Sequence, residues 1–127
     1  MAGTLITSTL QGTTLTDGTN STSTTNCIQG SAKAWVKFDG NGSISGVTSY
    51  NVSSVVRNST GNYTVNFTNS LADANYSTVM SNSNISSDGS IWINKTISQS
   101  ASNVQFGNIN VGNIYNDVSY LALVVFR

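Results

Sequence analysis

The segment from Tyr63 to Phe67 alternates strictly between large and polar side chains. In an extended chain Tyr63, Val65 and Phe67 fall on one face. Thr64 and Asn66 fall on the other face. Successive side chains of a strand point to opposite sides of its sheet, whereas a helix repeats every 3.6 residues. This period of two therefore predicts a half-buried β-strand.

Comparable short runs recur about every ten residues, separated by turn dipeptides such as Asp39-Gly40 and Asp88-Gly89. No apolar stripe of helical period persists for three turns. The sequence therefore predicts an all-β fold, an antiparallel β-sandwich of the jelly-roll-like kind. We expect the apolar run 120–126 to be a central strand covered on both faces, or a strand covered by another subunit. The other runs are residues 34–38, 50–57, 76–80, 91–97 and 104–109.

The beginning of the chain differs from the rest, because residues 13–29 hold almost no large apolar side chain. We therefore expect residues 1–30 to form an extended or weakly structured arm and residues 31–127 to form the β-sandwich domain. A polar arm needs partners if it is to be ordered, and sheet edges with few lysines invite pairing. Both features favour a homo-oligomer, with a trimer preferred.

The composition excludes several kinds of chemistry. The chain has no His and no Glu, one Cys, and a formal net charge of zero. Ser, Thr and Asn dominate it, with 21, 16 and 17 residues. The usual general base, most zinc sites and an intrachain disulfide are therefore ruled out. Without a basic face, nucleic acid and membrane surfaces are poor partners. We expect no enzymatic activity, no cofactor and no metal.

Three residues with possible chemistry are expected to have structural roles. Cys27 has no histidine to activate it, so we expect a silent free thiol, with an intermolecular contact as the alternative. Asp73 and Asp117 are the aspartates that do not precede a glycine. They could supply the carboxylate pair that glycoside hydrolysis requires, or oxygens for a weak calcium site. Neither has a recognisable motif around it.

Trp92 and Tyr115 are the candidate glycan contacts. Aromatic rings offer stacking faces to sugars, and both residues lie among many amide and hydroxyl side chains. Aromatic residues in strands are more often part of a core or a subunit interface. Because Trp92 alternates with two isoleucines, we expect it to be the more exposed of the aromatic residues.

The order of four strand motifs carries a resemblance to a known family. The chain is similar to a β-rich domain of virion structural proteins from tailed bacteriophages, including marine and cyanobacterial phages. The resemblance covers residues 31–67, extends to Tyr76 and returns at residues 124–127. It departs from the family pattern at Lys37, at residues 55–57 and at Leu71-Ala72. The motifs are Ala32–Gly40, Ser49–Val55, Gly61–Phe67 and Asp73–Tyr76.

The resemblance implies a virion protein made in the host cytoplasm and displayed on the outer surface of the particle. The family has no catalytic motif to transfer. We expect a capsid decoration, or cement, protein that binds the major capsid protein or other virion proteins. The alternative is a short tail-fibre or tail-tip protein that contacts a host surface glycan or receptor.

Overall fold

The computed structural model of the chain describes residues 14–16, 19, 21–83 and 92–127, and the chain divides into two units after Ser31. In the N-terminal unit, strand β1 (Thr14–Thr16) pairs antiparallel with β2 (Ser21–Ser23). The short helix α1 (Thr24–Gly30) follows directly.

Residues 24–30 form helix α1, so this part of the arm, expected to be extended or weakly structured, is not extended. The side chain of Ser23 caps the helix by accepting a hydrogen bond from the backbone N–H of Asn26 at 3.0 Å. Such a cap satisfies one of the N–H groups that the first turn leaves without a partner. The expectation for residues 1–13 lies outside the described residues.

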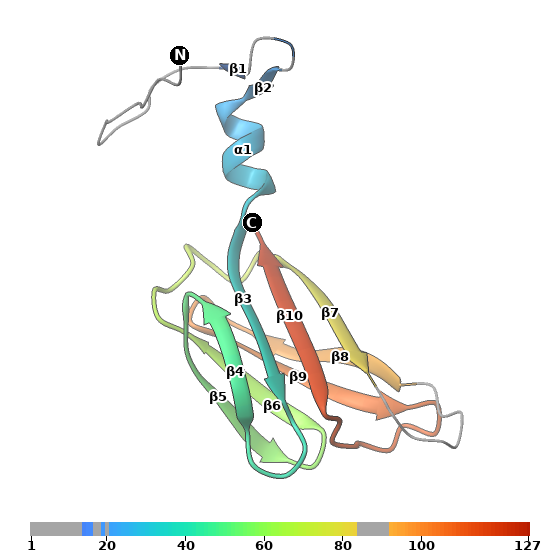
Figure 1. Ribbon diagram of the computed structural model, residues 1–127. Coiled ribbons are helices and arrows are strands. Elements are labelled where there is room, and N and C mark those ends of the chain that lie inside the picture. Colours follow the sequence, from blue (N-terminus) through green and yellow to red (C-terminus); the bar gives the residue numbers. More distant parts are fainter. Residues whose placement is uncertain (1–13, 17–18, 20, 84–91) are drawn as a thin grey trace. The chain divides into compact units, whose positions relative to one another are not determined.

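The second unit, residues 32–127, is an antiparallel β-sandwich of two four-stranded sheets, as predicted (Figure 1). One sheet has the order β4-β3-β10-β7 and the other the order β5-β6-β9-β8. The strands are β3 (Ala32–Asp39), β4 (Ser45–Tyr50), β5 (Val52–Ser59), β6 (Asn62–Phe67), β7 (Ser77–Ser83), β8 (Trp92–Gln99), β9 (Asn103–Asn110) and β10 (Tyr120–Phe126).

Three pairs of consecutive strands form hairpins within one sheet: β3–β4, β5–β6 and β8–β9. In a jelly roll, most consecutive strands instead lie in opposite sheets. Strand β10 lies between β3 and β7, so the apolar run 120–126 is a central strand, as one of the two expectations had it. Its inward residues are buried, but its outward residues are only half-buried, so the expected cover on both faces is incomplete. Strands β4, β7, β5 and β8 form the edges.

The core lies between the sheets and follows the predicted alternation. Strand β6 buries Tyr63, Val65 and Phe67, and β10 buries every second residue. Three aromatic rings meet at the centre, with centroids 5.3 Å apart for Phe38 and Tyr63 and 5.7 Å apart for Tyr63 and Phe106. Edge-to-face and tilted contacts at these distances are favourable.

Asn51 forms the corner at which the chain leaves β4 and enters β5 in the opposite sheet. Its φ of 54° lies in the left-handed region, which Asn tolerates better than most residues. The side-chain amide donates to the carbonyls of Lys33 and Asn69 at 3.0 and 3.1 Å. Its oxygen accepts from the backbone N–H of Asn69 at 2.8 Å. This one side chain therefore ties β3 of one sheet to the loop that follows β6 of the other sheet.

Candidate functional site

Trp92 begins β8, and its side chain lies on the face of that strand turned toward the other sheet. It shares this face with Asn94, which pairs in register with the fully buried Asn108. Ile93 lies on the outer face and is 48% exposed. The predicted alternation is confirmed, but the faces are reversed: the isoleucine faces outward and Trp92 is half-buried.

A groove lies between the edge strands β7 and β8, which belong to different sheets. Its cavity volume is about 410 Å³. Strand β7 contributes Thr78, Met80 and Asn82, which share the inward side of that strand with the buried residues of β10. We call this cavity the β7–β8 groove. Its lining residues are Thr78, Met80, Ser81, Asn82, Trp92, Asn94 and Thr96.

Two of the residues that line the β7–β8 groove each carry a buried polar atom that has no hydrogen-bond partner. These atoms are the indole Nε1 of Trp92, which is a donor, and the side-chain Oδ1 of Asn94, which is an acceptor. Most buried polar groups in proteins are paired, because an unpaired one loses its hydration without compensation. Two such atoms lie two residues apart on one strand face, beside the groove, and the described residues supply no partner for either.

Hydrogen bonds hold the lining residue Asn82 in place through Asn108. The amide nitrogen of Asn82 donates to Oδ1 of Asn108 at 2.8 Å, and the Asn108 amide donates to the carbonyl of Asn116 at 2.9 Å. The hydroxyls of Thr78 and Thr96 lie 3.4 Å apart across the two sheets. The groove therefore has ordered polar walls.

Tyr115, the second candidate, does not join Trp92. The Tyr115 backbone forms an isolated β-bridge with Ile109, and the Tyr115 ring lies directly over Gly107 of β9. Gly107 alternates with the inward-facing Phe106 and Asn108, so the Tyr115 ring covers the outer face of the sheet. The structure thus places the two candidate glycan contacts on opposite faces of one sheet.

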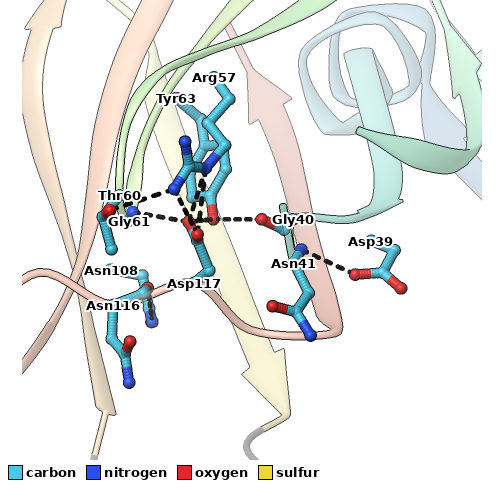
Figure 2. A network of polar contacts seen from close by, with 10 residues as sticks. All are labelled: Asp39, Gly40, Asn41, Arg57, Thr60, Gly61, Tyr63, Asn108, Asn116 and Asp117. Atoms are coloured by element: carbon cyan, nitrogen blue, oxygen red, sulfur yellow. Dashed lines mark hydrogen bonds and ion pairs between the residues drawn. The ribbon is translucent and has the colours of Figure 1, made fainter. Parts of the chain in front are cut away.

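Asp117 lies at the centre of a polar network at the β5–β6 turn (Figure 2). Arg57 donates to it through Nε at 3.0 Å and Nη2 at 2.5 Å, in a two-pronged ion pair. The backbone N–H of Gly61 donates at 2.8 Å. The single proton of the Tyr63 hydroxyl has two acceptors within reach, the Asp117 carboxylate at 2.7 Å and the Gly40 carbonyl at 2.9 Å.

These contacts shift two pKa values in opposite directions. Burial acts to raise the pKa of Asp117, but hydrogen bonds from Arg57, Gly61 and Tyr63 outweigh it and hold that pKa below its ordinary value. Burial, followed by the hydrogen bond to Asp117, raises the pKa of Tyr63 well above its ordinary value. At neutral pH the carboxylate is charged and the phenol is neutral, which suits a structural ion pair.

Asp73 is held by a different arginine at the other end of β10. Arg127 donates to it through Nε at 3.1 Å and Nη2 at 2.7 Å. Asp117 precedes β10 and Arg127 follows it, and a strand of seven residues spans roughly 20 Å. Carboxylates that cleave glycosidic bonds lie within about 10 Å of each other. The two aspartates therefore do not form such a pair.

The remaining expectations concern Cys27, metals and membranes. Cys27 lies in α1 as a free thiol. Among the described residues, no group of three or more aspartate or cysteine side chains is placed to hold a metal ion. Within the same residues, no helix has the length and apolar character needed to cross a membrane.

A row of apolar side chains crosses the outer face of the β4-β3-β10-β7 sheet. Tyr50, Trp35, Val124 and Val79 are consecutive cross-strand neighbours in register. Tyr50 and Val79 are each 58% exposed, and Trp35 is 39% exposed. We call these four residues the outer row. Aromatic and β-branched side chains in adjacent register support one another across a sheet, and they form a continuous apolar strip.

Some of these features have signals in the sequence. Trp92, Asn94 and Thr96 are spaced by two residues, so a strand over 92–99 places them on one face. The link between Arg57 and Asp117 joins residues 60 positions apart and has no local signal. No family model matches the chain, and no curated protein or solved structure matches it either.

Proposed function

We propose that the chain is a non-enzymatic structural protein of a tailed-bacteriophage particle, a capsid decoration protein displayed on the outer surface of the head. The resemblance of its strand motifs to virion proteins supports the class. The outer row carries the proposal of an assembly role, because exposed apolar strips of this kind are typical of surfaces that contact other subunits. The N-terminal unit offers a second contact, with the capsid or with a neighbouring subunit.

Gold-labelled antibodies against this chain, imaged on intact particles of the source phage, test the proposal. Label over the head supports decoration. Label confined to the tail overturns decoration in favour of a tail-fibre or tail-tip protein. Particles without label, beside a positive control with antibody against the major capsid protein, overturn the virion assignment itself.

The outer row is proposed to mediate self-association, with a trimer as the expected state. Val79→Lys places a charge in the strip and is expected to convert the oligomer to monomers. Val56→Lys is the matched control, because Val56 is 46% exposed on the outer face of β5, where its partner is Thr64. Size-exclusion chromatography with light scattering measures both masses. A monomeric parent protein, or a Val79→Lys protein with the parental mass, contradicts this interface.

The β7–β8 groove favours the second candidate function, a tail-fibre or tail-tip protein that contacts host glycans. A capsid decoration role needs no cavity with unpaired polar atoms. The distribution of antibody label described above separates the two candidates.

A further inference from the structure

The β7–β8 groove combines an aromatic ring with hydrogen-bonding side chains, and none of the described residues that line it is ionisable. Its volume of about 410 Å³ lies within the range of about 300–1,000 Å³ typical of small-molecule sites. It is also an order of magnitude larger than the roughly 30 Å³ share of one water molecule. The groove can therefore admit a ligand as well as solvent.

The two unpaired atoms define what such a ligand must offer. Nε1 of Trp92 needs an acceptor, and Oδ1 of Asn94 needs a donor. A hydroxyl group supplies both functions from one atom. A ligand with several hydroxyls could satisfy both atoms and also reach the Thr78 and Thr96 hydroxyls beside them.

The charges near the groove narrow the class of ligand further. Lys95 is the ionisable residue nearest in sequence to Trp92 and Asn94 in β8. It pairs in register with Gly107, on the outer side of the sheet, and is exposed. The described part of the lining offers an anionic ligand no countercharge, so such a ligand would lose hydration without compensation there. The lining therefore favours a neutral molecule.

Hydrogen bonds already fix some of the side chains that line the groove, and this favours ligand binding. Asn82 is fixed by Asn108, which is fully buried and is itself held by the Asn116 carbonyl. Side chains held in this way lose little freedom when a ligand arrives. Trp92 has a ring with an apolar face, and the C–H face of a sugar is the natural partner of such a surface.

We propose that the β7–β8 groove is a binding site for a neutral sugar residue, with Trp92 and Asn94 as its principal contacts. This proposal names the ligand class for the groove that favours the second candidate function, but its test does not depend on where the protein lies on a particle. Antibody imaging can therefore fail while sugar binding succeeds, and the reverse also holds.

The first test follows the indole N–H signals of the full chain by ¹⁵N-resolved nuclear magnetic resonance. The chain has two tryptophans, and a Trp35→Phe protein assigns their signals. The probes are neutral mono- and oligosaccharides of glucose, galactose, mannose and N-acetylglucosamine, with hexuronate oligosaccharides as the anionic comparison. We expect a neutral sugar to shift the Trp92 signal while the Trp35 signal stays in place.

The second test compares variants in a glycan-binding assay with the best neutral probe. Trp92→Ala is expected to weaken binding at least tenfold, and Asn94→Leu, which removes the unpaired acceptor, is expected to do the same. Ile93→Ala is the matched control on the opposite face of the same strand, where Ile93 is 48% exposed, and it should bind as the parent does. Circular dichroism and thermal unfolding verify the fold of each protein.

Three results would overturn the proposal. The first is an unmoved Trp92 signal with every neutral sugar at millimolar concentration, which means that the groove holds water only. The second is preferential binding of the anionic probe. The third is neutral-sugar binding that a folded Trp92→Ala protein retains in full.

Discussion

At the scale of single residues, Asp117 organises one end of the sandwich. Its carboxylate receives hydrogen bonds from a guanidinium, a backbone N–H and a phenol, which come from β5, the following turn and β6. The side chain of Asp117 is 13% exposed and that of Arg57 is 28% exposed, so water screens the pair only in part. Removal of the charge leaves the donors around it without their acceptor.

Asp117→Asn is expected to lower the free energy of unfolding at pH 7 by about 1–3 kcal/mol, since charged hydrogen bonds in a half-buried site are lost. The pKa of Asp117 is lower in the folded than in the unfolded protein. The stabilisation is therefore complete above the unfolded pKa of about 3.9 and is lost as the pH falls through the folded pKa. Urea unfolding at pH 7 and pH 2 should show the difference between variant and parent shrink in acid.

Asp73→Asn provides the comparison. Asp73 also pairs with an arginine, but 42% of its side chain is exposed, and solvent weakens such pairs. We expect little change in the free energy of unfolding at pH 7. A loss as large as that of Asp117→Asn would show that exposure does not separate these two ion pairs.

At the scale of elements, alternation identifies most strands but not all of them. The inward residues of β3, β6 and β10 are apolar at every second position, so the sequence predicts these strands closely. Strand β4 is an exposed edge strand with no buried residue, so it carries no alternating signal. Helix α1 escapes prediction because seven polar-rich residues with one cap give no apolar stripe.

The sequence also predicts only part of the candidate site. Local spacing places Trp92 on one face of a strand with Asn94 and Thr96, but does not say which face. That choice depends on β9, whose Asn108 and Phe106 face the core opposite those positions. The partners of Asp117 come from distant strands, so only the folded topology reveals them.

The corner at Asn51 is expected to depend on both its backbone and its side chain. Asn51→Gly keeps the left-handed conformation available but removes the three side-chain hydrogen bonds. Asn51→Ala removes the same bonds and adds about 1–2 kcal/mol of left-handed strain. We therefore expect Asn51→Ala to be the less stable of the two in thermal unfolding. Equal midpoints would mean that backbone strain at this corner is negligible.

At the scale of the whole molecule, the chain forms two compact units, residues 1–31 and residues 32–127. Residues 32–127 contain both sheets and the buried core between them. A protein of residues 32–127 alone is therefore expected to unfold cooperatively, with a midpoint within a few degrees of the full chain. Differential scanning calorimetry measures this. A large fall in the midpoint, or loss of cooperativity, would show that the sandwich needs the N-terminal unit.

The pairing of β10 with β3 has a consequence for the growing polypeptide on the ribosome. Strand β3 emerges first among the sandwich strands, yet its neighbour β10 is translated roughly 80 residues later. At about 5–20 residues per second, that interval is on the order of 4–16 s. During this time β3, whose inward residues include Val36 and Phe38, lacks the neighbouring strand β10. Nascent chains therefore remain open to chaperones and proteases until β10 emerges, and premature termination before Tyr120 leaves the first sheet without its centre.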